Sequence, residues 1–174
     1  GSAWAIGDLG RLSVPPLVRQ VIDSRLNRLG EEVRAALESA SVIGQDVPFA
    51  LWSAVSGVPE DELATVVARA VDAHLLTDAR DGTRLRFPHA LVREAMYERL
   101  LLPRRIEVHR QMAEILMRSP SVVPDTIAHH LQEAGDPRAV EWFIQAGVRA
   151  ERIAWLTAAE HFRSALQLMR PHDT

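Results

Sequence analysis

The 174-residue sequence contains no cysteine and no lysine: all 20 of its basic residues are arginine. The absence of cysteine excludes disulfides and thiolate catalysis, and it does not favour a structural zinc site. The absence of lysine excludes a nucleotide-binding loop of the pattern GxxxxGK[ST], Schiff-base catalysis and the acyl-transfer motif SxxK. We therefore expect that this chain is not an enzyme and has no catalytic residues of its own.

Long apolar runs are also missing. The longest apolar segments are interrupted by Arg, Asp or Glu every few positions, and none approaches the roughly 20 residues that a membrane-spanning helix requires. The first residues do not follow the pattern of a secretory signal. We expect a cytoplasmic protein segment that does not interact with membranes.

Apolar residues make up 47% of the chain and charged residues 25%, which is enough apolar material for a packed core. The length suits one ordinary domain or two small ones. The net charge of −3 provides no general attraction to nucleic acid or to an anionic membrane surface.

The first half of the sequence predicts the element order of a winged helix, a variant of the helix-turn-helix. Apolar residues recur at helical spacing after Pro15-Pro16 and again after Gly30, and Asp81-Gly82 is a typical hairpin turn pair. The expected helices cover residues 15–29, 31–43, 49–55 and 59–74. A short strand is expected at 45–47, and a β-hairpin is expected from 75–78 and 85–87.

The second half is expected to be entirely helical. Pro103, Pro120 and the Gly135-Asp136-Pro137 segment separate its apolar patterns. The expected helices cover residues 90–101, 103–118, 124–134, 137–152 and 156–169. The last two share a pattern of small and large residues, namely Ala139, Phe143, Ala146 and then Ala158, Phe162, Ala165, which is typical of paired-helix repeats.

These patterns predict a mainly α-helical fold with two domains. The first, residues 14–102, is a winged-helix domain with one small β-hairpin and flanking helices. The second, residues 103–174, is an antiparallel helical array of the tetratricopeptide type.

A winged helix first suggests DNA binding, but the charge pattern does not favour it. The helix expected to enter the major groove, residues 60–74, carries four acidic side chains and only Arg69 as a basic one. Residues 31–90 hold ten acidic side chains against five arginines, and such a surface repels the phosphate backbone. We therefore assign no DNA-binding residues to this segment.

The seven histidines do not indicate a metal site. His129 and His130 are adjacent, and neighbouring helical residues point about 100° apart, so they do not chelate one ion well. Asp125 precedes His129 by one helical turn, but such a pair is more often a surface contact. We assign no metal ligands.

His89 lies between the expected hairpin and the next helix, in the segment LRFPHALVRE. An imidazole at a helix N-terminus, with Arg93 nearby, can bind an anion or a phosphate. The alternative is a histidine whose side chain is satisfied by local backbone groups, and composition and spacing alone favour this alternative.

Two stretches of the sequence resemble a known family. Residues 85–116, LRFPHALVREAMYERLLLPRRIEVHRQMAEIL, and the preceding VPPLVRQVIDSRLNRLGEEVRAALESASVIG resemble the region that follows the nucleotide-binding core of STAND-class signalling ATPases. More narrowly, they are similar to large bacterial LuxR-type regulators and to ATPase modules attached to some nucleotide cyclases. The later stretch DTIAHHLQEAGDPRAVEWFIQAGVRAERIAWLTAAEHFRSALQLM is similar to the start of that family's repeat array. The resemblance covers about residues 14–169.

The resemblance implies a winged helix followed by tetratricopeptide-like repeats. It also implies a longer parent protein, in which a nucleotide-binding domain with ADP or ATP and Mg precedes residue 1 and an output domain lies elsewhere. In related switch ATPases a winged-helix histidine contacts the β-phosphate of ADP, and His89 falls at that position. Eukaryotic relatives follow this histidine with Asp, whereas Ala90 stands here, so no role of that Asp is carried over.

Three functional hypotheses follow. In the first, the chain is the regulatory segment of a nucleotide-driven switch: the winged helix closes on the nucleotide-binding domain through His89, and the repeats bind an effector or partner. In the second, it is a stand-alone winged-helix transcription factor, which predicts salt-sensitive binding to duplex DNA. In the third, it is a helical adaptor that binds a protein partner.

Overall fold

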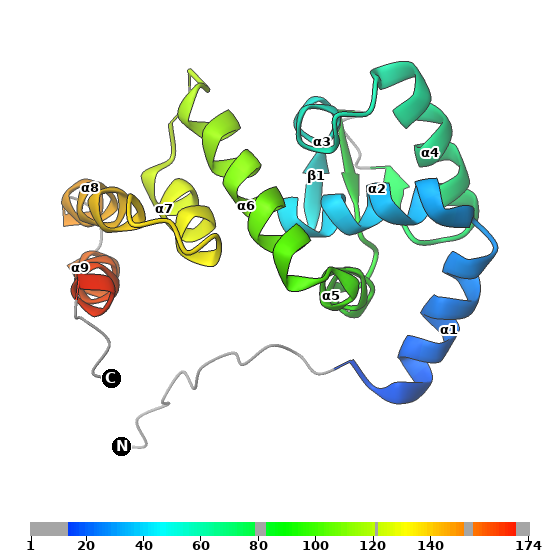
Figure 1. The fold of residues 1–174 in the computed structure, drawn as a ribbon, viewed down its shortest axis with the longest axis horizontal. Helices are drawn as coiled ribbons and strands as arrows, with labels where there is room; N and C mark the ends of the chain where they lie inside the picture. The colour runs from blue at the N-terminus through cyan, green and yellow to red at the C-terminus, as the bar shows by residue number, and fades with distance from the viewer. Residues whose placement is uncertain (1–13, 79–82, 121, 152–154, 170–174) are drawn as a thin grey trace. The chain divides into compact units, whose positions relative to one another are not determined.

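The computed structural model describes residues 14–78, 83–120, 122–151 and 155–169, and over these residues the fold is mainly helical, as predicted (Figure 1). The helices are α1 (Pro16–Asn27), α2 (Gly30–Ile43), α3 (Phe49–Ser56), α4 (Glu60–Asp72), α5 (Ala90–Arg99), α6 (Leu102–Met117), α7 (Pro124–Glu133), α8 (Ala139–Glu151) and α9 (Trp155–Met169). The strands are β1 (Asp46–Pro48), β2 (Thr77–Asp78) and β3 (Arg84–Arg86). None of the described helices has the length and apolar character needed to cross a membrane.

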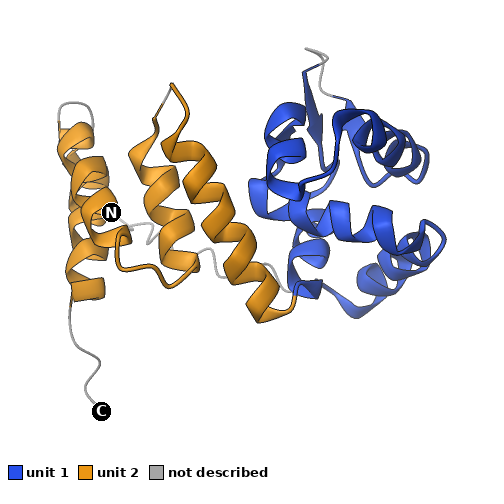
Figure 2. Ribbon diagram, turned by 45° about the horizontal axis from the view of Figure 1, so that its top comes forward, with its two compact units in different colours: residues 1–100 blue, residues 101–174 orange. Residues whose placement is uncertain are grey.

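The chain divides into two compact units, residues 1–100 and residues 101–174 (Figure 2). Unit 1 contains α1 to α5 and the sheet, and unit 2 contains α6 to α9. The sequence pattern predicts a division after residue 102, two residues further along the chain.

The turn between α1 and α2 differs from the prediction of one helix that continues to Leu29. Helix α1 ends at Asn27, and α2 begins at Gly30, where φ is 81°. The N–H groups of Arg28 and Leu29 donate to carbonyls three residues back, which tightens the last turn of α1, and the side chain of Leu29 is buried. Gly30 supplies the positive φ, at which an L side chain would be strained.

Helix α2 lies at the centre of unit 1, where α1, α3, α4, α5 and β1 all pack against it (Figure 1). Its apolar positions Val33, Leu37 and Ala40 are fully buried. Trp52 of α3 is fully buried beside it, and the Trp52 indole N–H donates to the Ala36 carbonyl at 2.9 Å. Burial of the indole is therefore achieved without leaving its N–H unpaired.

The sheet has three antiparallel strands in the order β1–β3–β2, one more than the predicted hairpin. The short strand expected at residues 45–47 is present as β1, one residue further along the chain, and it pairs with β3. Val47 lies opposite Leu85 and both side chains are buried, whereas Asp46 forms an ion pair at 3.0 Å with Arg86 on the exposed face. The turn pair Asp81-Gly82 lies outside the described residues.

Ion pairs attach α5 to α1 and α2. Arg19 pairs with Glu98, and Arg99 pairs with Asp23 and lies 3.5 Å from the carboxylate of Glu38. Burial raises the pKa of Glu38 above its usual range, although the nearby guanidinium groups act in the opposite direction. These contacts help hold the α5 helix against the core.

Unit 2 is a succession of helices in which the principal contacts join α6 to α7, α7 to α8 and α8 to α9 (Figure 2). Each helix reverses the direction of the one before it. The core side chains come from all four helices: Ala113, Ile127, Ala128, Leu131, Ala139, Phe143 and Ala165.

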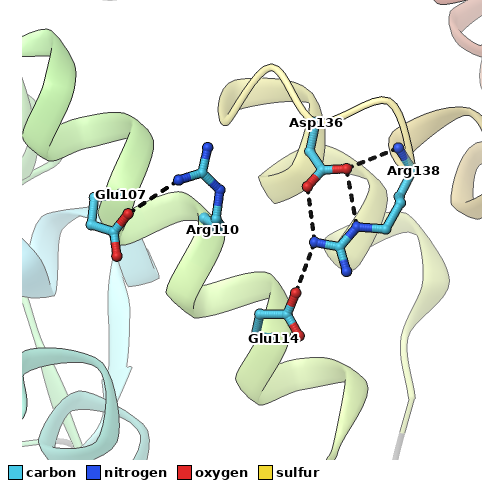
Figure 3. Close-up of polar contacts among 5 residues, drawn as sticks. All are labelled: Glu107, Arg110, Glu114, Asp136 and Arg138. Atoms are coloured by element: carbon cyan, nitrogen blue, oxygen red, sulfur yellow. Dashed lines mark hydrogen bonds and ion pairs between the residues drawn. The ribbon is translucent and has the colours of Figure 1, made fainter.

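A polar network links α6 to the turn between α7 and α8 (Figure 3). Gly135, with φ at 64°, ends α7, and the guanidinium of Arg138 then pairs twice with the Asp136 carboxylate, at 3.0 and 2.8 Å. The same guanidinium lies 2.7 Å from the carboxylate of Glu114 on α6. Hydrogen bonds from Arg138 lower the pKa of Asp136 below its usual range.

Candidate functional site around His89

His89 is held at the start of α5 by the segment that precedes it. Phe87 is fully buried, and its backbone N–H donates to the Gln45 carbonyl at 3.0 Å while the Gln45 side-chain amide donates to the Phe87 carbonyl. The chain therefore leaves the sheet at a fixed point, and His89 follows two residues later with extended backbone angles (φ −134°, ψ 137°).

The imidazole of His89 is exposed, and its side chain does not cap the helix. Its backbone carbonyl accepts the N–H groups of Val92 at 3.0 Å and Arg93 at 3.4 Å, so His89 is the N-cap residue through its main chain alone. The local backbone thus leaves the imidazole available. An exposed imidazole at the positive end of a helix can donate a hydrogen bond to an anion.

Arg93, which the sequence placed near His89, has another role in the structure. Its Nε donates to the Ser41 carbonyl at 3.0 Å, and its guanidinium carbon lies 5.8 Å from the centre of the Tyr97 ring. Arg93 thus attaches α5 to the C-terminal end of α2. Among the described residues, no hydrogen bond joins the side chains of Arg93 and His89.

Glu94, to which the sequence pattern assigns no role, is buried next to Arg93. It is 9% exposed, its Oε2 lies 3.8 Å from the Arg93 guanidinium, and its Oε1 has no hydrogen-bond partner in the described part of the chain. A carboxylate here offsets the positive charge of Arg93. The imidazole of His89 therefore remains the group of this site that can bind an anion.

A second histidine cluster lies in unit 2. His130 of α7 and His109 of α6 are both buried, and their Nδ1 atoms lie 2.9 Å apart, within hydrogen-bond distance. Burial, together with the nearby His129, lowers the pKa of His130 to about 4. The sequence does not predict this contact, because nothing in it pairs His109 with a residue of the next helix.

This cluster does not meet the requirements of a metal centre. His129 is exposed, and its ring centroid lies 6.0 Å from that of His109. Within the described ranges, no group of three or more metal-ligating side chains has the arrangement needed to hold an ion. We interpret the contact between His109 and His130 as a hydrogen bond that satisfies two buried polar side chains.

The helix that would enter DNA in a winged helix is α4. Its first turn carries Glu60, Asp61 and Glu62, all exposed. These three carboxylates lie at the end of the helix that would have to approach the phosphate backbone, which disfavours that docking.

Comparisons with protein-family models, with curated proteins and with solved structures found no match to this chain. The resemblance to the STAND-class ATPases therefore rests on the sequence stretches quoted above.

Proposed function

We propose that this chain is a regulatory and interaction segment of a larger nucleotide-dependent signalling or transcription-regulating ATPase. Unit 1 is a winged helix that senses bound ADP or ATP in the parent's nucleotide-binding domain, and unit 2 begins a tetratricopeptide-like array that binds an effector or partner. The observation that carries the proposal is the exposed imidazole of His89 at the N-cap of α5, close after the sheet.

The element order of unit 1 supports the winged-helix assignment. Helices α2, α3 and α4 are followed by strands β2 and β3, and β1 between α2 and α3 completes the small antiparallel sheet. Helix α5 follows directly, and the resemblance requires the nucleotide-contacting histidine at this junction. His89 is that residue.

The exposed side chains of unit 2 support a role in binding. Helices α8 and α9 expose large apolar side chains, including Ile144, Val148, Trp155, Leu156 and Leu166. Exposed apolar patches are typical of protein-interaction sites, and helical repeats bind partners on extended surfaces of this kind. A ligand that binds one conformation of the parent better than the other would shift its switch equilibrium.

The test is His89→Ala in the parent protein, with His129→Ala as the matched control because it removes an exposed histidine from unit 2. Nucleotide that co-purifies is released by denaturation and quantified by ion-exchange chromatography, and basal output activity is measured in parallel. We expect His89→Ala to retain less ADP and to show higher basal activity than the control. Unchanged ADP retention and basal activity would remove His89 from the mechanism.

Two simpler observations bear on the larger proposal. The parent reading frame should contain a GxxxxGK[ST] loop upstream of this segment, and its absence would contradict the proposal. Fluorescence anisotropy with duplex DNA should detect no salt-sensitive binding by this chain, since residues 31–90 are acidic. Salt-sensitive binding would favour the stand-alone transcription factor.

A further inference from the structure

A second feature of unit 1 lies away from the sequence motifs. The C-terminal ends of α1 and α4 enclose an open cavity of about 500 Å³. Its polar lining consists of Arg25, Arg28, Arg69, Asp72 and His74. A volume of this size is typical of a site for a small molecule.

The charge of this lining contrasts with that of the rest of unit 1. Three arginines and one acidic residue, Asp72, line the cavity, whereas residues 31–90 as a whole are acidic. Arg25 and Arg28 form no ion pair with any residue in the described part of the chain. Guanidinium groups that line one cavity repel each other, and a bound anion would reduce that repulsion.

A purely structural role accounts for part of this cluster. The Arg69 guanidinium donates to the Leu29 carbonyl and so attaches α4 to the turn between α1 and α2. Arg25 lies in the last turn of α1, where a cation interacts favourably with the helix dipole. The Arg28 guanidinium takes part in neither of these contacts. The Arg25 guanidinium does not donate a hydrogen bond in either of them. Two forked donors therefore remain at the cavity.

His74 contributes an imidazole to the lining and has an unusual backbone conformation. Its φ is 58°, the one positive φ of a non-glycine residue in the described part of the chain. Its Nδ1 lies 2.9 Å from the Asp72 carbonyl, and because a carbonyl only accepts, Nδ1 carries the hydrogen. The Nε2 atom is not used by this bond and remains available at the cavity.

We propose that this cavity binds a small oxyanion with two neighbouring phosphoryl groups. The planar guanidinium fork matches two oxygens of one phosphoryl group, so the free forks of Arg25 and Arg28 suit an anion with two such groups. Arg69 adds a third arginine to the lining of the cavity. The site does not include His89, and it does not depend on the proposed function.

The experiment is isothermal titration calorimetry of the whole 174-residue chain with inorganic pyrophosphate at moderate ionic strength. Arg25→Gln/Arg28→Gln removes the two free guanidinium groups, and Arg104→Gln/Arg118→Gln removes two exposed arginines of unit 2 as the matched control. We expect the first variant to bind at least tenfold more weakly and the control to change by less than twofold. His89→Ala should bind as the unmodified chain does, which separates this site from the proposed nucleotide contact.

A gain of affinity provides an independent test. Asp72→Asn removes the one carboxylate of the lining and should tighten pyrophosphate binding several-fold. If circular dichroism shows that the Arg25→Gln/Arg28→Gln variant is unfolded, the comparison of Asp72→Asn with the unmodified chain tests the proposal by itself. Lack of binding by the unmodified chain at millimolar pyrophosphate, or equal loss in the two arginine variants, would overturn the proposal. Citrate that binds as tightly as pyrophosphate would overturn the phosphoryl assignment.

Discussion

The aromatic ring of Phe162 occupies the space in which a side chain at Gly147 would lie. A Cβ built on Gly147 of α8 would be 2.6 Å from Cε1 of Phe162 on α9, which is far inside van der Waals contact. The absence of a side chain at residue 147 therefore allows α8 and α9 to approach each other with the ring between them. Gly147 is required here for space, because its φ is not in the left-handed region.

This relationship predicts that Gly147→Ala destabilises unit 2. The ring must move or the helices must separate, and such overpacking typically costs about 1–3 kcal/mol, which exceeds the gain in helix propensity from replacing Gly by Ala. The measurement is the free energy of unfolding from urea denaturation, followed by circular dichroism.

A double-mutant cycle isolates the cause. In a Phe162→Leu background the branched side chain is shorter, so Gly147→Ala should cost less than it does beside the phenyl ring. An equal cost in both backgrounds would mean that the loss of stability does not arise from contact with Phe162.

The small and large residues that predicted this helix pair were visible in the sequence, whereas the contact between Gly147 and Phe162 was not. Periodicity predicts which face of a helix is apolar, and it correctly placed Ala146, Ala158 and Ala165 in the interior. It does not predict which residue of the next helix lies opposite. The same limit applies to His109 and His130, which belong to different helices.

The sequence located the short strand β1 but did not predict which strand it pairs with. Strand β1 has three residues, too few for an alternating pattern, and its pairing with β3 depends on contacts 40 residues apart in sequence. The cavity between α1 and α4 was also not predicted, because Arg25 and Arg69 look like ordinary solvated helix residues until the fold brings them together. His89, by contrast, was located from the proline and the helix start that flank it.

The buried histidine pair predicts that acid destabilises unit 2. The pKa of His130 is about 4 in the folded chain, and the ordinary value of 6.5 applies when the chain is unfolded. Between these values the unfolded chain binds more protons, so the free energy of unfolding falls as pH decreases from 6.5 to 4. At about 1.4 kcal/mol per pH unit, the loss amounts to roughly 3 kcal/mol.

The check is the same denaturation series at pH 7 and pH 4.5. His109→Leu/His130→Leu should lose much of the pH dependence, since an apolar pair replaces the two imidazoles. His89→Ala, which removes an exposed histidine from unit 1, should retain it. Equal pH dependence in all three proteins would assign the acid sensitivity to other groups.

His74 and Gly135 occupy equivalent positions after α4 and α7. Both helix ends have the hydrogen bonds of the Schellman arrangement. The N–H of Leu75 donates to the Ala70 carbonyl after α4, and the N–H of Asp136 donates to the Leu131 carbonyl after α7. His74 adopts φ 58° where Gly135 has φ 64°, and an L residue there costs energy. His74→Gly is therefore expected to raise the free energy of unfolding, by up to about 1 kcal/mol after the entropy cost of glycine.

The converse substitution provides the control. Gly135→Ala meets no atom within 4 Å of the new Cβ, so only the backbone strain changes, and we expect a loss of about 1 kcal/mol. If His74→Gly also weakens pyrophosphate binding while it stabilises the fold, the strained histidine is maintained for the cavity. Destabilisation by His74→Gly would contradict this account of the α4 terminus.

The pairing of Arg138 with Asp136 and Glu114 predicts a small effect on stability and a clear effect on titration (Figure 3). The side chain of Arg138 is 45% exposed, and exposed ion pairs contribute at most about 1 kcal/mol, so Arg138→Gln should cost less than that. The folded-state pKa of Asp136 is lowered by Arg138, so the contribution of Asp136 to stability is present above the ordinary carboxyl pKa and is lost as pH falls.

Carbon-detected NMR titration of the Asp136 carboxylate should show a higher pKa in Arg138→Gln. Arg110→Gln should raise it much less, because Arg110 pairs with Glu107 on its own helix and does not hydrogen-bond to Asp136. An Asp136 titration that is the same in both variants would mean that the hydrogen bonds from Arg138 do not set its pKa.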